Sequence, residues 1–450
     1  MAYLKGFMRN WRNVMASAGI ALMAWSPAQS AEGTFKTLYS FCTDSACRDG
    51  ASPGAAPTIG AGGRLFGETH LGGAAGEGAI YELIFDVEGG KWKETVLYSF
   101  CSATNCVDGA KPVGRVILDG DDALIGATEA GGANNGGVIY RLAREGRAGR
   151  WTQSVLYSFC SMTNCADGSV PQSGPIPDRS GRLYGTTTCG GSHGIGCLNF
   201  AGAVYELSPN ATKSNWTEQV LYSFCGQNIC VDGQDPLGAV VIDGSGYLYG
   251  TAAFGGDGGG VVFKLSPGQP NGEWNETLLH TFGVSAGFDG SHSLAGLARD
   301  KAGNLFGTTV VGGNGQGTAF RLSPDVAGSG WTETILTKFC ATPAVCPYGA
   351  YPTGGLLIGE DGDLIGTGTG GGAKGGGAAF KLKPNRGKTI WTATALHSFS
   401  CAAARCPSGT APPDGLTSDA VGNLFGVTTA GAAAPGQGGS IFELTAGEGE

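Results

Sequence analysis

Residues 221–225 read Leu-Tyr-Ser-Phe-Cys, and the first part of this motif recurs along the whole chain. A Leu-x-x-Phe segment begins at Leu38, Leu97, Leu156, Leu221, Leu279, Leu336 and Leu396. Successive copies are about 57–65 residues apart, which is typical of a tandem repeat. A tryptophan precedes the segment in six of the seven copies: Trp92, Trp151, Trp216, Trp274, Trp331 and Trp391. The sequence therefore predicts seven copies of one structural unit.

Three further strand-length segments complete each unit. The first is a short apolar run that ends in an acid-and-glycine turn, as in 239–244. The second reads Leu-aromatic-Gly-Thr, as in 248–251, and the third follows a glycine cluster, as in 261–265. All three are bounded by Gly, Asp or Pro, as short strands between turns are. Four such strands in each of seven units predict an all-β, seven-bladed β-propeller with four antiparallel strands per blade.

The two ends of the repeat array predict how the ring closes. The N-terminal copy has only the Leu-x-x-Phe strand, at 38–41, whereas the C-terminal copy has the other three strands and ends at Leu444. If the N-terminal strand completes the last blade, no sheet edge stays exposed. A solenoid would need polar end caps, and no copy resembles a cap. We therefore expect residues 31–450 to form a single propeller domain.

The order of segments resembles the blade of NHL-type β-propellers. The whole unit is more closely similar to the GloVer repeat of the choice-of-anchor tandem repeat family of exported bacterial proteins. The shared pattern is Leu-Tyr-Gly-Thr, Gly-Gly, Val-Phe-x-Leu, and Leu-Tyr-Ser-Phe followed by Asp-Gly, and it covers residues 33–444. The resemblance implies export and a propeller-like repeat array, and it carries no established activity. The chain departs from the family name in having no visible anchor segment.

Residues 1–30 are expected to be a cleavable signal peptide. Lys5, Arg9 and Arg12 precede an apolar run at 14–25, and the small residues of 28–30 place the cleavage near Ser30. The run is too short for a transmembrane helix, so no membrane span is expected in the mature chain. We predict a secreted or periplasmic protein. Loss of three positive charges changes the formal net charge from −9 to −12, which disfavours binding to nucleic acid.

The 14 cysteines fall into close pairs, which predicts disulfides in an oxidising compartment. The unit around 283–288 lacks both members of its pair, as pairing predicts. Redox catalysis is disfavoured because no Cys-x-x-Cys occurs, and zinc because the cysteine spacing is loose and only five histidines exist. The expected bonds are Cys42–Cys47, Cys101–Cys106, Cys160–Cys165, Cys189–Cys197, Cys225–Cys230, Cys340–Cys346 and Cys401–Cys406.

Strand alternation predicts that the cysteine loops and the glycine loops share one face, around the mouth of an axial channel. Loops on a rigid scaffold are favoured binding sites. The aspartates that follow five cysteine loops could bind cations or sugar hydroxyls, or could be turn residues that accept backbone hydrogen bonds. Because the face's histidines belong to three different blades, we expect no metal site and no cofactor. His280 and His397 replace the strand tyrosine, which favours a packing role for both. The candidate binding residues are Asp49, Asp108, Asp167, Asp232, Asp289, His70, His193 and His292.

Two functional classes stay open. The first is an exported, non-catalytic binding module, monomeric, whose partner is a glycan, a small molecule or a protein. The alternative is an extracytoplasmic propeller enzyme with lactonase-, lyase- or glycosidase-like activity on a carbohydrate or other small molecule. An enzyme should break the repeat symmetry with clustered acids, histidines or arginines on one face. The visible candidates are scattered in the sequence: Glu68, His70, Glu129, His193 and His292.

Overall fold

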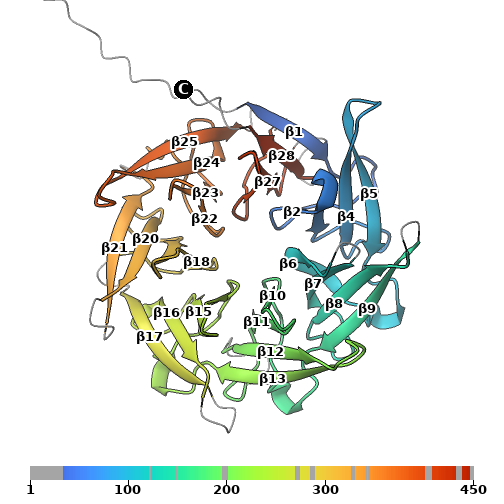
Figure 1. Cartoon of the computed structure of the whole chain (residues 1–450), viewed down its shortest axis with the longest axis horizontal. Helices are drawn as coiled ribbons and strands as arrows, with labels where there is room; N and C mark the ends of the chain where they lie inside the picture. Colours follow the sequence, from blue (N-terminus) through green and yellow to red (C-terminus); the bar gives the residue numbers. More distant parts are fainter. Residues whose placement is uncertain are drawn as a thin grey trace, which may run out of the picture. The chain divides into compact units, whose positions relative to one another are not determined.

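The computed structural model describes residues 34–445, apart from 121–122, 147–148, 195–200, 269–273, 284–288, 326–329, 341, 343–344, 401–407 and 432–437. The described residues form seven four-stranded antiparallel sheets that stand as blades around a ring (Figure 1). The predicted seven-bladed propeller is thereby confirmed. The predicted signal peptide lies outside the described residues. Within them, no helix has the length and apolar character needed to cross a membrane.

The blades follow one another around the ring in chain order. Blade 1 contains β2 (Thr58–Ile59), β3 (Leu65–Thr69), β4 (Ala79–Asp86) and β5 (Lys91–Ser99). Blade 2 contains β6 (Ala110–Leu118), β7 (Ala123–Ala130), β8 (Val138–Arg144) and β9 (Trp151–Ser158). Blade 3 contains β10 (Ile176–Pro177), β11 (Leu183–Thr187), β12 (Ala203–Pro209) and β13 (Trp216–Ser223). Blade 4 contains β14 (Val241–Ile242), β15 (Leu248–Ala252), β16 (Gly258–Ser266) and β17 (Asn275–Gly283).

The remaining blades repeat this order from the centre of the ring outward. Blade 5 contains β18 (Ala298–Arg299), β19 (Leu305–Thr309), β20 (Thr318–Pro324) and β21 (Trp331–Lys338). Blade 6 contains β22 (Leu357–Ile358), β23 (Leu364–Gly368), β24 (Gly375–Pro384) and β25 (Trp391–Ser400). Blade 7 contains β26 (Thr417–Ser418), β27 (Leu424–Thr428), β28 (Ser440–Leu444) and β1 (Phe35–Ser40). Short 3-10 turns occupy Ala61–Gly63, Thr104–Cys106, Thr163–Cys165 and Asn228–Cys230.

Blade 7 joins the two ends of the chain. Strand β1 pairs antiparallel with β28, in a register that places Phe35 opposite Leu444 and Ser40 opposite Ser440. The backbone N–H of Phe41 extends this ladder by donating to the Gly439 carbonyl at 3.0 Å. In Figure 1 the blue β1 lies beside the dark red β28. The predicted closure of the ring by the N-terminal strand is confirmed.

The core lies between blades. The phenylalanine of each Leu-x-x-Phe segment is buried against an aromatic ring on the third strand of the next blade. The distances between ring centroids are 4.7–5.3 Å at all seven junctions, in the tilted or edge-to-face geometry that aromatic pairs prefer. The pairs are Phe41–Tyr81, Phe100–Tyr140, Phe159–Tyr205, Phe224–Phe263, Phe282–Phe320, Phe339–Phe380 and Phe399–Phe442.

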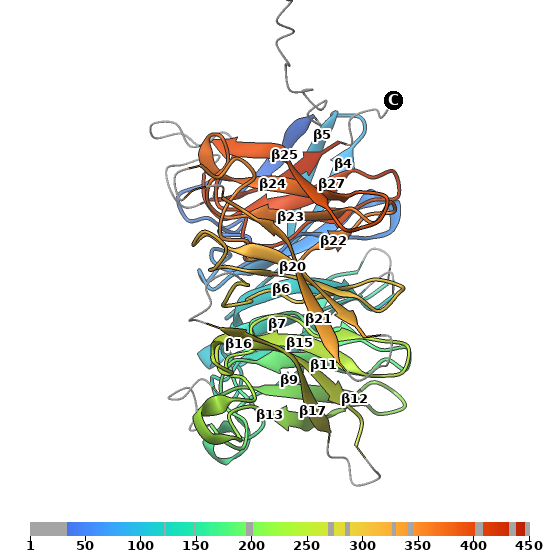
Figure 2. The ribbon, with the colours of Figure 1, turned by 90° about the vertical axis from the view of Figure 1, so that its left-hand side faces the viewer.

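The cysteine loops and the glycine loops share one face, which we call the loop face. Seen edge-on, the strands run across the thickness of the ring, so successive loops alternate between its two faces (Figure 2). A glycine-loop N–H donates to a cysteine-loop carbonyl in several blades, as from Gly73 to Cys47 at 2.9 Å. Five of the expected disulfides close these loops: Cys42–Cys47, Cys101–Cys106, Cys160–Cys165, Cys225–Cys230 and Cys340–Cys346. Cys197, Cys401 and Cys406 lie outside the described residues.

Candidate functional site

One residue with a left-handed backbone, with φ between 52° and 59°, stands six residues before the inner strand in six blades and within the inner strand in blade 2. Each of these residues stands two positions after a glycine, which ends a cysteine loop in six blades and the equivalent loop without cysteines in blade 5. Six of the seven residues precede a proline. An L residue rarely adopts this conformation, and a β-branched one such as Val170 almost never does. Its presence in every blade shows that the fold imposes it. These residues, called the central ring below, are Ser52, Lys111, Val170, Asp235, His292, Tyr351 and Ala411.

Hydrogen bonds between blades hold the central ring in this conformation. The N–H of each residue donates to a carbonyl in the glycine loop of the preceding blade, at 2.7–3.3 Å. A left-handed conformation costs about 1–2 kcal/mol, and only a surrounding structure that fixes both ends maintains it. The donor–acceptor pairs are Ser52–Gly438, Lys111–Glu77, Val170–Gly136, Asp235–Ala201, His292–Gly259, Tyr351–Gln316 and Ala411–Gly376.

The side chains of the central ring are the part of these segments that solvent reaches. In blade 1, for example, the neighbours Ala51 and Pro53 are buried while Ser52 is partly exposed. The residue that follows the central-ring residue is buried in every blade, and the residue that precedes it is buried in five of the seven. The backbone is therefore the same seven times, whereas the side chains are unlike: a hydroxyl, an ammonium, an isopropyl group, a carboxylate, an imidazole, a phenol and a methyl group. A rigid frame with variable side chains is the usual organisation of a binding surface.

Ionisable side chains from two blades and an amide from a third meet on one side of the central ring. His70 Nε2 lies 3.5 Å from Glu129 Oε1, and Lys111 Nζ lies 3.7 Å from the same oxygen. The Gln172 side-chain amide donates to Glu129 Oε2 at 3.0 Å. The structure thus brings together His70 and Glu129, which are far apart in sequence. We call His70, Lys111, Glu129 and Gln172 the charged cluster.

Glu68 breaks the repeat symmetry close to this cluster. Four other blades have threonine at its position, and Thr251, for example, donates to the inner-strand carbonyl of Ala295 at 2.9 Å. Glu68 is 1% exposed; its Oε1 accepts from the Gly54 N–H at 3.2 Å, and its Oε2 is buried without a hydrogen-bond partner among the described residues. Burial raises the pKa of this carboxyl well above its usual range, and the nearby Asp414 and Glu129 raise it further. Burial therefore favours the protonated form of Glu68.

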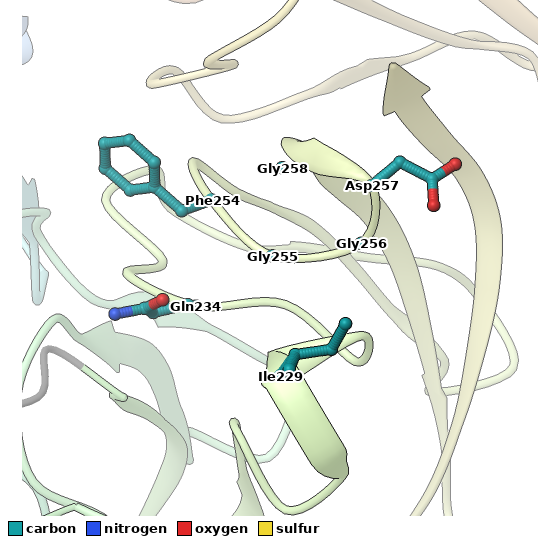
Figure 3. Close-up of a pocket in the computed structure, with 7 residues that line it drawn as sticks. All are labelled: Ile229, Gln234, Phe254, Gly255, Gly256, Asp257 and Gly258. Atoms are coloured by element: carbon teal, nitrogen blue, oxygen red, sulfur yellow. The ribbon is translucent and has the colours of Figure 1, made fainter. Parts of the chain in front are cut away.

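The opposite part of the loop face carries two exposed aromatic side chains. Phe254 is 40% exposed, and its ring meets the imidazole of His292 edge-to-face at 4.8 Å. Tyr351 is similarly exposed. Beside Phe254 lies an open pocket of ≈ 490 Å³, in which Phe254 and Ile229 rise from different loops of one blade (Figure 3). Its lining residues are Ile229, Gln234, Phe254, Gly255, Gly256, Asp257 and Gly258.

The aspartates proposed from the sequence face into their own loops. Asp167 is fully buried and accepts hydrogen bonds from Tyr157 Oη at 2.8 Å and from the backbone N–H groups of Ser161 and Met162 at 2.8 and 3.1 Å. This pattern is the one expected of turn residues. Tyrosine hydroxyls bind Asp49, Asp108 and Asp232 in the same way, whereas Asp289 faces His280.

The three histidines proposed from the sequence lie in separate surroundings. His70 belongs to the charged cluster and His292 to the central ring. His193 Nδ1 lies 3.2 Å from the Ser223 carbonyl oxygen in the glycine loop of blade 3. Among the residues with described positions, no group of three metal-type ligands contains any of them.

Sequence reasoning missed most of the central ring and two members of the charged cluster, Lys111 and Gln172. A signal was available: the residue two positions after the loop glycine differs in all seven units, although that glycine recurs in every unit and a proline follows in six. Variation at one fixed position of a repeat indicates that the side chain at this position is not needed for the fold.

Comparisons with solved structures support the fold alone. The chain resembles the extracellular domain of a candidate one-component system, BT4673, from B. thetaiotaomicron, with 11% identity and a TM-score of 0.51, over 91% of this chain and 40% of that one. The chain therefore spans well under half of that protein. A candidate 6-phosphogluconolactonase from Bacteroides uniformis matches with 14% identity and a TM-score of 0.45, over 83% and 89% of the two chains. No curated protein matches the sequence.

The repeat itself identifies the family. The family model described as the Gloeobacter/Verrucomicrobia repeat matches residues 18–199 and 153–348, which together make up most of the chain. These residues include complete blades of the ring, with their glycine loops and Leu-x-x-Phe strands. The resemblance that the repeat pattern suggested is confirmed, and the chain belongs to the Gloeobacter/Verrucomicrobia repeat family.

Proposed function

We propose that this protein is a non-catalytic binding module whose ligand sits at the centre of the loop face, on the central ring. The observation that carries the proposal is that seven identical backbone positions present seven unlike side chains. Each position is fixed by hydrogen bonds to the preceding blade, so the site is pre-organised and little entropy is lost when a ligand binds.

The two sides of the site favour a carbohydrate as the ligand. The charged cluster offers a carboxylate, an ammonium and an amide, which hydrogen-bond to hydroxyl groups. Phe254 and Tyr351 offer exposed rings, and His292 a partly exposed one, for the apolar faces of a sugar. Within the cluster, Lys111 balances the charge of Glu129, which suits a neutral glycan better than a strongly charged one.

We further propose that the protein is exported, with cleavage near Ser30, and that it acts as a monomer. The five disulfides support export, since such bonds persist in oxidising compartments. The net charge of −9 argues against nucleic acid as a partner.

A glycan array probed with the mature chain, followed by calorimetry on the best hits, tests the proposal. Lys111→Ala and Tyr351→Ala change opposite sides of the central ring and should each weaken glycan binding at least about tenfold, the effect of losing a central contact. Lys213→Ala is the matched control, because Lys213 lies in the turn between β12 and β13 on the opposite face and pairs with Asp119 at 3.0 Å. Glycan binding that survives both central-ring substitutions, or binding to proteins alone, would refute the proposal.

A propeller enzyme is the second candidate, and Glu68 is the observation that favours it. A buried carboxyl whose protonated form is favoured by burial can act as a general acid toward a bound glycoside or lactone. Glu68→Gln would then abolish turnover while binding persists. If the unmodified protein binds a glycan and releases no product, the binding function stands and the enzyme function fails.

A further inference from the structure

The junctions between blades repeat a small polar arrangement on their outer side. At the junction of blades 3 and 4, Tyr222 Oη donates to Asp232 Oδ2 at 3.0 Å, and Glu276 of the next blade lies against the same aspartate. Burial, with the Asp232 charge as a further cause, raises the pKa of Glu276 to about 7. Equivalent sets of Tyr, Asp and Glu stand at the junctions of blades 7 with 1 and 2 with 3.

The junction of blades 4 and 5 differs in one residue. His280 of β17 replaces the tyrosine, while Asp289 and Glu333 of β21 are kept. His280 Nε2 lies 3.6 Å from Asp289 Oδ2 and 3.8 Å from Glu333 Oε2. One ligand atom from each of the three residues lies within 4.8 Å of the other two. His280 Nε2, Asp289 Oδ1 and Glu333 Oε1 are buried and have no hydrogen-bond partner among the described residues.

This is also the one cysteine-loop position at which the sequence has no cysteine pair. The other loops that lead from an outer strand to the next inner strand carry two cysteines each. The histidine and the loss of both cysteines therefore fall in the same repeat unit. A cross-link of another kind would compensate for the missing disulfide.

The distances are too long for hydrogen bonds and suit atoms bridged by an ion. Protein hydrogen bonds between nitrogen and oxygen are about 2.7–3.2 Å long. Two ligands on a tetrahedral zinc ion, each about 2.0–2.2 Å from the metal, are separated by roughly 3.3–3.6 Å. A few tenths of an ångström of movement would bring the imidazole nitrogen to that spacing from each carboxylate, and the three ligand atoms already lie within 4.8 Å of one another. Ca²⁺ prefers a shell made of oxygen ligands, so the imidazole selects against it.

We propose that His280, Asp289 and Glu333 form a binding site for a divalent transition-metal ion, with Zn²⁺ as the preferred ion, that joins blades 4 and 5 beside the one loop that lacks a cysteine pair. The expectation of no metal site rests on the loose cysteine spacing, on the small number of histidines and on the separation of the loop-face histidines. His280 belongs to a strand instead, and its two carboxylate neighbours come together only across the blade junction.

A second strand histidine gives an internal control. His397 occupies the equivalent position at the junction of blades 6 and 7, where Ser408 and Phe35 replace the aspartate and the glutamate. Its imidazole stacks on the Phe35 ring with centroids 4.0 Å apart. His397 therefore has the ligand atom without the two carboxylates, and it should not bind the ion.

The test is a calorimetric titration of the chelator-treated mature chain with ZnCl₂, alongside melting curves. The unmodified chain and the His397→Tyr control should bind one Zn²⁺ per chain and melt at a higher temperature with Zn²⁺ than without. His280→Tyr recreates the arrangement around Tyr222, so this variant should fold and should melt like the unmodified chain in the absence of metal. Its affinity for Zn²⁺ should fall more than about a hundredfold, and Zn²⁺ should not raise its melting temperature. If His280→Tyr does not fold, Glu333→Gln replaces it and copies Gln153 of blade 2, which donates to the Asp108 carbonyl at 3.0 Å.

Several outcomes would overturn the site. One is the absence of saturable Zn²⁺ binding by the unmodified chain. Another is equal affinity in the unmodified chain and His280→Tyr, which would place the ion elsewhere. Binding of several Ca²⁺ ions that does not depend on His280 would assign cation binding to the other carboxylate pairs. Each of these results leaves the proposed glycan site on the loop face untouched, since the two sites share no residue.

Discussion

Replacing Phe41 by alanine should destabilise the whole ring, although Phe41 follows the first described strand of the chain. Its ring is fully buried and lies 5.0 Å from the ring of Tyr81 in blade 1. Phe224, in the middle of the chain, is equally buried and lies 5.0 Å from Phe263. The two phenylalanines thus fill the same kind of site, one at the closing junction and one at an ordinary junction.

The magnitude follows from the burial of the side chain. Truncating a fully buried phenylalanine to alanine costs about 3–5 kcal/mol, because transfer free energy is lost and a cavity remains. If β1 frayed freely at the chain end, the substitution of Phe41 would cost far less stability, since the folded state would not depend on this strand. Closure by β1 therefore predicts that Phe41→Ala and Phe224→Ala have similar costs.

Urea unfolding of the mature chain, followed by tryptophan fluorescence, measures both variants against the unmodified protein. We expect the two unfolding midpoints to fall together. A normal midpoint for Phe41→Ala beside a large drop for Phe224→Ala would refute the role of β1 in closing the ring. Deletion of residues 33–41 is the coarser version of the experiment and should lower the melting temperature at least as much.

Three further predictions concern stability. Tyr140→Phe should stabilise the protein by about 1–3 kcal/mol, measured by urea unfolding, because the Tyr140 hydroxyl is buried without a partner among the described residues and four other blades carry phenylalanine there. Stability should fall as the pH rises from about 5 to 8. Burial, and then the neighbouring aspartates, raise the pKa of Glu94 to about 7 and that of Glu218 to about 8. Because the folded protein then holds protons that the unfolded chain releases, a rise in pH favours the unfolded chain. The melting temperature should change less across this pH range in Glu218→Gln than in the unmodified protein. A stability that increases with pH would contradict the raised pKa values. Replacing Cys101 and Cys106 by serine should cost less than the ~3 kcal/mol expected from chain entropy for a 15-residue loop, because this loop is shorter; a larger loss would mean that the bond supports the fold and not only its loop.

The repeat made the ring predictable, and contacts between blades made the site unpredictable. Leu-x-x-Phe and the position of Leu444 were enough to place every blade, because each unit packs in the same way on its neighbours. Local rules mislead at the central ring, since a residue before proline, such as Val170, favours extended backbone. The hydrogen bond from Val170 to Gly136 of the preceding blade overrides that preference. The charged cluster was hidden for a similar reason, because its members meet only where three blades converge.

The pairing of the first and last strands also has a consequence for biosynthesis. Thr34 and Thr445 are hydrogen-bonded at a sequence separation of 411 residues. At translation rates of about 5–20 residues per second, roughly 20–80 seconds pass between the synthesis of the two partners. During that time the first strand has no pairing partner, and the nascent sheets have exposed edges. Exposed edges are the condition in which chains aggregate. The protein should therefore depend on holding factors until its last residues emerge, and truncated products should aggregate instead of persisting as partial rings.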